Sequence, residues 1–277
     1  MLGSACFKYF SMNNEFTTFG TSRTRSDIYL KCNSAEDLNS ILTGNQIDFL
    51  INCIGIIKPY IDEQDTKSVT ETIRMNSLFP HEITLIAKIH NVRIIQIATD
   101  CVFSGDKGNY LESDIHDSKD LYGKSKSLGE VKDRLFLNLR TSIVGEEINK
   151  TSSLLEWFLN HPKGKISGFS NHYWNGITTY HFAIVCAGII LHDYNLSGTQ
   201  HLVPKNTVTK AELLKTFKKV YNKSELEIST VLSSNYIDRS LSTINEEINL
   251  TLWKLAGYNQ PPTIENLIIE SKSFYST

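Results

Sequence analysis

The stretch Val92-Arg-Ile-Ile-Gln-Ile-Ala-Thr-Asp100 is a nearly continuous apolar run that ends in two polar residues. Runs of this kind are typical of parallel strands that are covered on both faces. Residues 48–52 and 135–139 repeat the pattern, and helical periodicity fills residues 67–90 and 121–133 between the three runs. Strands that alternate with helices predict an α/β fold, a doubly wound parallel sheet of the Rossmann type.

The first part of the chain predicts shorter elements of the same kind. Residues 4–10 carry apolar side chains at helical spacing, so we expect a short amphipathic helix there. Residues 15–19 and 27–30 are rich in β-branched and aromatic side chains and are expected to form strands. A helix is expected after Ser34, a residue type suited to the N-cap.

Polar residues stand where the expected strands end. Arg23, Asn52, Thr99 and Thr141 each follow or close one of these runs. In doubly wound sheets, ligands bind outside the carboxyl ends of the strands. The four residues therefore mark the edge of the sheet at which we expect the ligand site.

The sequence pattern changes after Gly145. Helices are expected at residues 152–159, 181–192 and 210–221, the last opened by a capping box, and a final helix is expected after two consecutive prolines. Irregular polar and aromatic segments lie between them. We therefore expect a dinucleotide-binding domain at residues 1–145 and, at 146–277, a smaller substrate-binding lobe with segments that return to the main domain.

Composition limits the classes of partner. The 277 residues are 40% hydrophobic, enough for a full core, and the net charge of −2 favours neither nucleic acid nor a membrane surface. The five cysteines are scattered without a Cys-x-x-Cys pair, and no histidine pair has metal-ligand spacing, so we expect no metal and a reduced, cytoplasmic protein. The longest apolar stretch, residues 183–191, is too short to span a bilayer and is expected to be a buried helix face.

Tyr122 and Lys126 form a Tyr-x-x-x-Lys pair, and Thr99 ends the strand that precedes their helix. Positions i and i+4 of a helix share one face, so the phenol and the ammonium are expected to point into one cleft. A nearby ammonium favours an ionised phenol and is expected to lower the pKa of Tyr122. Together the three residues fit hydride transfer at a sugar-like carbonyl, with Tyr122 exchanging the proton and Thr99 binding the oxygen.

The chain resembles the extended short-chain dehydrogenase/reductase family, and within it the dTDP-4-dehydrorhamnose reductase branch. The resemblance covers most of the chain and is weaker after Gly145. The segments that carry it are Ile51-Asn-Cys-Ile-Gly55, Asn76, Ala98-Thr-Asp-Cys-Val-Phe103, Gly105 to Gly108, Asp120-Leu-Tyr-Gly-Lys-Ser-Lys126 with Gly129-Glu130, and Leu139-Arg-Thr-Ser-Ile-Val-Gly145.

The resemblance implies roles for individual residues. The catalytic triad would be Thr99, Tyr122 and Lys126. The residues implied to bind the dinucleotide are Met1, Leu2, Gly3, Ser22, Arg23, Asn52, Cys53, Ile54, Gly55, Asn76, Ala98, Tyr122, Lys126, Thr141, Ser142 and Ile143. The residues implied to contact the substrate are Asp100, Cys101, Trp174 and Arg239, with Trp157 and Phe169 as further aromatic candidates that core packing explains equally well.

Arg23 bears on the type of cofactor. It stands where a carboxylate would bind the ribose hydroxyls of NAD, and with Arg25 it suits the additional 2′-phosphate of NADP. An ordinary solvated arginine is the alternative. NADP (NADPH) is therefore the preferred cofactor, and NAD remains an alternative.

The sequence departs from the family pattern in two places. Cys101 replaces the tyrosine usual in this branch, and an inert buried thiol is favoured over a reactive one. The opening Met1-Leu-Gly-Ser4 is similar to only the tail of the family's Gly-x-x-Gly-x-x-Gly loop. We therefore expect the first strand of the fold to be missing, either because the chain begins farther upstream or because this version has lost it.

The function expected from these features is an NAD(P)H-dependent reductase of a nucleotide-linked 4-keto-6-deoxy sugar in cell-surface polysaccharide synthesis. The first alternative is a nucleotide-sugar epimerase or dehydratase of the same fold, and a dehydratase is disfavoured because no Glu follows Asp100. The second is a non-catalytic, NADP-binding regulatory subunit on this scaffold. The expected partner is the nucleotide-sugar substrate, and a homodimer is compatible with the sequence.

Overall fold

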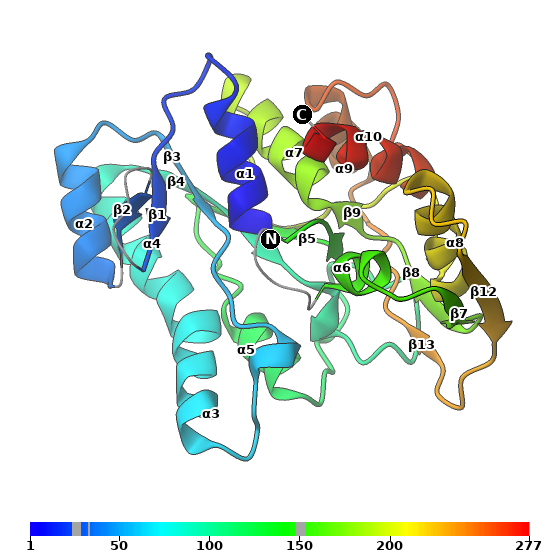
Figure 1. Ribbon diagram of the computed structural model, residues 1–277. Coiled ribbons are helices and arrows are strands. Elements are labelled where there is room, and N and C mark those ends of the chain that lie inside the picture. The colour runs from blue at the N-terminus through cyan, green and yellow to red at the C-terminus, as the bar shows by residue number, and fades with distance from the viewer. Residues whose placement is uncertain (24–28, 33, 148–152, 277) are drawn as a thin grey trace.

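Four parallel strands form the main sheet of the computed structural model, which describes residues 1–23, 29–32, 34–147 and 153–276 (Figure 1). The strands lie in the order β10-β5-β4-β3. Their bounds are Phe49–Asn52 (β3), Arg93–Ala98 (β4), Phe136–Arg140 (β5) and Gly198–His201 (β10). The three apolar runs of the sequence are thus confirmed as strands, and β10 returns from the C-terminal half to extend the sheet.

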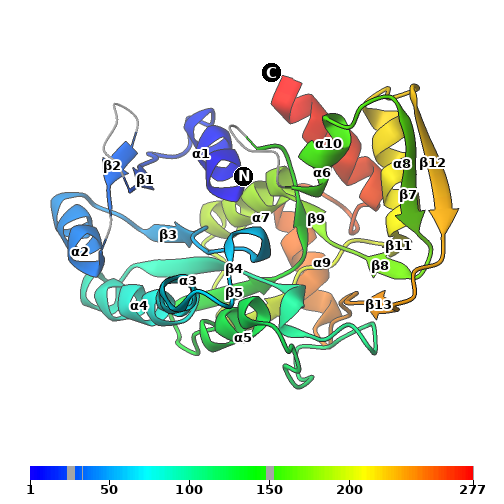
Figure 2. The ribbon, with the colours of Figure 1, turned by 60° about the horizontal axis from the view of Figure 1, so that its bottom comes forward.

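Helices cover both faces of this sheet, which confirms the doubly wound arrangement (Figure 2). Successive side chains of a strand point to opposite faces. Ile95 of β4 and Leu137 of β5 therefore pack with α1 (Leu2–Ser11) and α7 (Thr179–Leu191). Ile94 and Phe136 pack on the other face with α2 (Ala35–Gly44) and α4 (Phe79–His90).

The N-terminal segment differs from the expectation at one strand. Helix α1 forms as expected, but residues 15–19 have no regular structure, and the strand β1 is Gly20–Ser22. Among the described residues, β1 pairs only with β2 (Tyr29–Lys31) and no strand pairs with residues 15–19. The Phe16 ring instead packs 4.7 Å from the Phe10 ring. Of the strand expected at 27–30, residues 27 and 28 lie outside the described residues. Within the described residues, β1 and β2 form a separate two-stranded sheet that is not paired with β3.

The helix expected at residues 67–90 is interrupted by a wide turn. It runs as α3 (Thr66–Ile73), a π-helical turn at Arg74–Leu78 and then α4. Pro80 has no N–H, so the regular helical bond to the carbonyl of Asn76 cannot form. Turns of this kind are frequent at functional sites.

The helix after β4 ends earlier than expected. It is α5 (Leu121–Leu128), whereas the sequence pattern predicted a helix to residue 133. Gly129 lies against the carbonyl of Asn76, so close that a Cβ at Gly129 would stand 2.0 Å from that oxygen. The chain turns away from the helix at this contact and enters β5.

The C-terminal half adds a second apolar core. It lies between α6 (Leu154–Leu159), α8 (Lys210–Val220), α10 (Ile264–Ser276) and the strands β7 (Gly164–Phe169), β8 (His172–Trp174) and β12 (Leu226–Val231). The smaller elements are η1 (Lys58–Tyr60), η3 (Asp100–Val102), β6 (Ile143–Val144), β9 (Ile177–Thr178), β11 (Val208–Thr209), β13 (Ile237–Asp238) and α9 (Glu246–Leu255). The capping box of Thr209 and Glu212 is present at the start of α8. The domain boundary expected at residue 145 stays a prediction.

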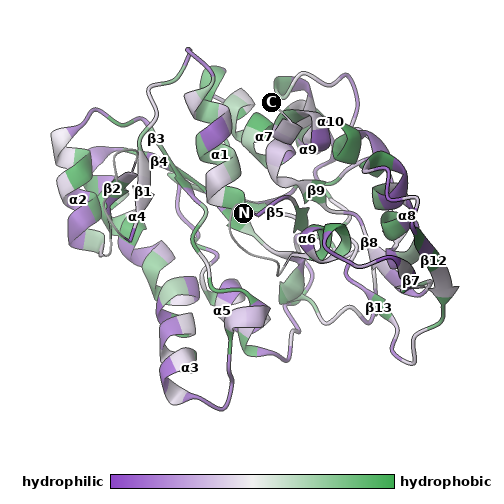
Figure 3. Cartoon of the chain, in the orientation of Figure 1, coloured by the Kyte–Doolittle hydropathy of each residue, from purple (hydrophilic) through white to green (hydrophobic). Residues whose placement is uncertain are grey.

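Helix α7 confirms the prediction that the apolar stretch at residues 183–191 is a buried helix face. Figure 3 shows it green along much of its length, and most of its side chains are buried against α1, the sheet and α9. No helix among the described residues is long and apolar enough to cross a bilayer.

Gly129→Ala tests the close contact between α5 and the wide turn. The added Cβ would collide with a backbone oxygen that cannot rotate away, so the free energy of unfolding should fall by about 1–3 kcal/mol in urea denaturation. Gly44→Ala in α2 is the matched control, because a Cβ there meets no atom within 4 Å. That variant should gain about 0.5–1 kcal/mol, and equal stabilities of the two variants would contradict the packing argument.

Candidate active site

Helix α5 is held tightly against the end of β4. Asp120 caps it by accepting a hydrogen bond from the Gly123 N–H at 2.8 Å. A Cβ at Gly123 would stand 2.2 Å from the carbonyl oxygen of Cys101, so only glycine permits this approach. The first turn of α5, which carries Tyr122, therefore lies directly beside residues 99–101.

Thr99, Tyr122 and Lys126 are brought together at this point. The Thr99 hydroxyl accepts a hydrogen bond from the Cys101 N–H at 3.2 Å and is also a hydrogen-bonding neighbour of the Tyr122 phenol. The Lys126 ammonium donates to the carbonyl of Ile97, two residues before Thr99, at 3.0 Å. A strand end and one helix face thus supply a hydroxyl, a phenol and an ammonium to one place.

The expected effect of Lys126 on the phenol is wrong in this structure. Burial raises the pKa of Tyr122 above its ordinary value, the neighbouring Cys101 acts in the same direction, and Thr99 opposes them. The Lys126 ammonium is directed to the Ile97 carbonyl. Burial also lowers the pKa of Lys126 to about 8, against a smaller opposing effect of Glu130. Tyr122 is consequently a protonated donor near neutral pH.

Asn76 fixes the loop that follows β3. Its side chain accepts from the Ile56 N–H at 2.8 Å and donates to the Ile56 carbonyl at 2.9 Å and to the Ser125 hydroxyl at 3.1 Å. Gly55 lies between this amide and Lys126: a Cβ there would stand 3.4 Å from Asn76 Oδ1 and 4.0 Å from Lys126 Nζ. One buried amide in the wide turn therefore positions both α5 and the backbone expected to line a dinucleotide.

A row of buried amides crosses the sheet beneath this loop. Asn52, Gln96 and Asn138 stand side by side in the register of β3, β4 and β5. Asn52 donates to Gln96 at 2.7 Å, and Gln96 donates to Asn138 at 3.2 Å and to the Gly129 carbonyl at 2.8 Å. Asn52 is thus 2% exposed, and its side chain bonds within the sheet. The sequence analysis did not identify Gln96 and Asn138 as part of the site. The signal that could have done so is a single polar residue inside each apolar run.

A buried ion pair fixes the connection from α5 to β5. Arg140, at the end of β5, donates to both carboxylate oxygens of Glu130, at 2.9 and 2.5 Å. His116 and His201 lie against the same guanidinium, at 2.8 and 2.7 Å. Burial and the Arg140 charge lower the pKa of His201 to about 4, so it is a neutral acceptor. The sequence analysis did not predict the Arg140–Glu130 ion pair, although Glu130 belongs to a segment that carries the family resemblance.

Three cations surround the carboxylate of Asp100. Burial raises its pKa, while Arg239, Lys210 and Lys58 act in the opposite direction, in that order of size. Arg239 is held by a 2.9 Å hydrogen bond to the Phe103 carbonyl. Lys58 pairs with Asp120 at 2.6 Å and lies 5.9 Å from the centre of the Tyr122 ring. Lys210 and Lys58 were missed because tertiary folding alone brings them here.

The remaining substrate candidates differ in exposure. Cys101 lies beside Tyr122, and burial raises the pKa of its thiol to about 12, as expected for an inert cysteine. Trp174 is 6% exposed, packs in the second core and donates to Ser142 at 2.9 Å, with Lys210 5.9 Å from its ring centre. Trp157 and Phe169 are 41% and 37% exposed.

The start of α1 lies where a dinucleotide could reach it. Met1 is its N-cap and provides no side-chain hydrogen bond, so the first N–H groups of the helix are not capped by a side chain. A Cβ at Gly3 would stand 3.6 Å from the Cβ of Cys53, which places this helix end beside the loop after β3. A helix N-terminus beside the loop after β3 fits the phosphates of a dinucleotide.

The other residues expected to bind the cofactor lie around the same edge of the sheet. Arg23 is exposed and directly follows β1, whereas Arg25 lies outside the described residues. Thr141 is buried at the end of β5, and Ile143 starts β6. These positions agree with the rule that ligands bind at the carboxyl ends of the strands.

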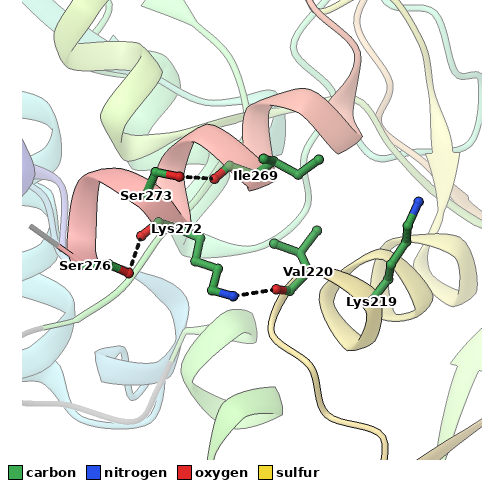
Figure 4. Close-up of a pocket in the computed structure, with 6 residues that line it drawn as sticks. All are labelled: Lys219, Val220, Ile269, Lys272, Ser273 and Ser276. Atoms are coloured by element: carbon green, nitrogen blue, oxygen red, sulfur yellow. Dashed lines mark hydrogen bonds between the residues drawn. The ribbon is translucent and has the colours of Figure 1, made fainter.

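A surface cavity of about 540 Å³ lies elsewhere, between α8 and α10 (Figure 4). Its lining includes Lys219 and Lys272, and the Lys272 ammonium donates to the Val220 carbonyl at 2.7 Å. None of the residues singled out from the sequence lines it. In the described part of the chain, no group of three His, Cys, Asp or Glu residues is placed to hold a metal ion.

Comparison with known proteins agrees with this geometry. The family described as "RmlD substrate binding domain" matches residues 1–271. Methionine adenosyltransferase 2 subunit beta of Danio rerio is 29% identical over 230 residues, which cover 77% of this chain and 68% of that protein.

Solved structures show the same fold. A dTDP-4-dehydrorhamnose reductase from Bacillus anthracis in complex with NADP has a TM-score of 0.70 at 17% identity, covering 88% of this chain and 85% of that one. A UDP-N-acetylglucosamine 4-epimerase from Bacillus cereus has a TM-score of 0.77 at 14% identity, covering 100% and 96%. At these identities the likeness shows a Rossmann-type fold and leaves activity open.

Lys126→Met tests the charge state of the buried lysine. The pKa of Lys126 is about 8 in the folded protein, against about 10.4 in an unfolded chain, so between these values the unfolded state holds the additional proton. Stability should therefore rise with pH in that window for the wild type relative to the variant. Urea unfolding from pH 7 to 10 measures the difference, with Lys124→Met on the exposed side of α5 as control. A difference that does not change with pH would contradict the assignment.

Proposed function

Because the chain belongs to the family described as the RmlD substrate binding domain, we propose that it is an NADPH-dependent reductase of a nucleotide-linked 4-keto-6-deoxy sugar. The observation that carries the proposal is the convergence of Thr99, Tyr122 and Lys126 at the end of β4. A proton donor, a hydrogen-bond donor for the carbonyl oxygen and an ammonium are the groups that carbonyl reduction requires.

Each of the three residues has its own role in the proposed reduction. NADPH, when bound, supplies the hydride to the keto carbon. Tyr122 gives its proton to the developing alkoxide, and its raised pKa keeps that proton in place until the oxygen becomes basic. Thr99 donates a hydrogen bond that orients the carbonyl. Lys126 binds the ribose and stabilises the phenolate that Tyr122 leaves behind.

The dinucleotide would be held by the start of α1, the loop from Cys53 to Gly55, and residues 141–143. Arg23 favours NADP over NAD by pairing with the 2′-phosphate. The similar fold of the reductase described in complex with NADP supports this choice. Asp100, Cys101 and Arg239 would contact the sugar or its diphosphate, in a cytoplasmic protein of cell-surface polysaccharide synthesis.

A second candidate function is a dinucleotide-binding subunit of another enzyme. It is favoured by the similarity to a protein named as a beta subunit of methionine adenosyltransferase 2. In that case the dinucleotide would stabilise the fold and no sugar would be reduced. The compact Thr99, Tyr122 and Lys126 group favours the reductase, because dinucleotide binding alone does not require a positioned proton donor.

Tyr122→Phe separates these candidates. With NADPH and a panel of 4-keto nucleotide sugars, turnover should fall by roughly 10²–10⁴-fold while NADPH affinity, measured by fluorescence titration, stays the same. Tyr194→Phe is the matched control, since Tyr194 lies at the opposite end of β4, where its carbonyl accepts from Arg93. Wild-type protein that binds NADPH but reduces no sugar of the panel would favour the subunit function. Unchanged turnover in Tyr122→Phe would exclude Tyr122 as the donor.

Arg23→Ser tests the cofactor preference. Removing the guanidinium should weaken NADPH binding by about tenfold or more and leave NADH binding unchanged, because only NADPH carries the 2′-phosphate. Calorimetric titration with both dinucleotides measures the two affinities. An equal loss for NADH and NADPH would contradict a specific phosphate contact.

A further inference from the structure

Three of the five cysteines lie close together beneath the proposed dinucleotide site. The Sγ atoms of Cys6 and Cys53 are 3.9 Å apart, and Cys186 lies near both residues. All five cysteines are free thiols. Cys6 and Cys186 are 5% and 0% exposed, whereas Cys53 is half-buried, so Cys53 is the thiol of this cluster that solvent can reach.

The helix face that carries Cys6 touches the loop that carries Cys53. Gly3 and Cys6 stand three residues apart on α1 and so share one helix face. A Cβ at Gly3 would be 3.6 Å from the Cβ of Cys53, which shows that this face touches the loop after β3. A disulfide requires sulfur atoms about 2.05 Å apart. The remaining approach of roughly 2 Å is within the reach of side-chain rotation and a small shift of the helix.

We propose that Cys6 and Cys53 form a reversible disulfide that links oxidation of the protein to the dinucleotide site. The proposal is carried by the sulfur distance, the contact of α1 with the loop after β3, and the exposure of one thiol of the pair. The contact with Cys53 and burial raise the pKa of Cys6, which makes Cys6 the second and not the first thiol to react.

The oxidant is a hydroperoxide. The Cys53 thiolate attacks one peroxide oxygen, the O–O bond breaks, and the product is a sulfenic acid with water or an alcohol as the leaving molecule. The Cys6 sulfur then attacks the Cys53 sulfur, the S–O bond breaks, and hydroxide leaves as water with the proton of Cys6. The two thiols lose two electrons and the peroxide gains them. A dithiol reductant reverses the bond by exchange.

The Cys6–Cys53 disulfide would affect dinucleotide binding, an effect that rests on the proposed function. Cys53 belongs to the loop that would line the dinucleotide, and Cys6 lies one turn from the uncapped start of α1. Drawing the two together narrows the space between the helix end and the loop. Oxidation should therefore weaken NADPH binding and, by linkage, bound NADPH should shift the thiol–disulfide equilibrium toward the reduced form.

Mass spectrometry of the full-length protein tests the bond itself. After treatment with hydrogen peroxide and blocking of remaining thiols, non-reduced peptides should contain a Cys6–Cys53 link that dithiothreitol removes. Cys6→Ala should abolish the link and leave Cys53 at the sulfenic acid or a higher oxidation state. Cys186→Ala and Cys32→Ala should retain it. A link from Cys53 to Cys186, or no intramolecular link at all, would overturn the proposal.

A second measurement tests the coupling. The affinity of the verified disulfide form for NADPH should be about fivefold or more below that of the reduced form. In a dithiothreitol redox buffer at equilibrium, saturating NADPH should correspondingly raise the fraction of reduced wild-type protein. An unchanged affinity would overturn the coupling. Protein that forms the disulfide but never binds NADPH would instead contradict the proposed function, so the two failures can be told apart.

Discussion

The position of the active-site helix depends on buried polar groups that must find partners inside the sheet. Gln96 has no access to water, and an unpaired amide there would be costly, so its bonds to Asn138 and to the Gly129 carbonyl hold the end of α5 to β4. The ion pair of Arg140 with Glu130 adds a second attachment one residue further on. The end of α5 is therefore bonded to the same strand that carries Thr99, and Tyr122 meets Thr99 because both belong to one rigid unit.

The same rigidity explains the electrostatics of the site. Tyr122 is half-buried and Lys126 is buried, and burial raises the pKa of the phenol and lowers that of the ammonium. The cations Arg239, Lys210 and Lys58 lie close enough to Asp100 to oppose the effect of burial on its pKa. A half-buried phenol that keeps its proton, next to a carboxylate surrounded by cations, suits an anionic substrate whose neutral carbonyl is to be protonated.

The sequence predicted the main sheet well because its signal is local. Each buried strand is a short apolar run, and each helix between them has its own periodicity, so β3, β4, β5 and α4 could be located without knowing their neighbours. The same reasoning wrongly predicted a strand at residues 15–19, because a strand also needs a neighbouring strand with which to pair. The early end of α5 depends on a contact with Asn76, more than 50 residues away in the chain. A contact between residues so far apart in the chain does not produce a periodic pattern in the sequence.

The candidate site was predictable only in part, for the same reason. Thr99, Tyr122 and Lys126 are close in sequence and follow a recognisable spacing, and the structure places them together. Arg239 was predicted as a substrate contact from its resemblance to a family segment, whereas nothing in the sequence around Lys210 indicates that it also lies near Asp100. The direction of the Tyr122 pKa also could not be foreseen, because burial of a side chain is a property of the whole fold.

The wide turn at Arg74–Leu78 has a consequence for how this protein can change over evolution. A π turn accommodates one residue more than an α-helical turn, so losing a residue there would restore regular winding and rotate the preceding helix by about 100° relative to α4. Asn76 would then leave the loop that it anchors, while the hydrophobic core of α4 would be untouched. Length variation at this one turn is thus a route by which a lineage could lose ligand binding and still keep a well-folded scaffold.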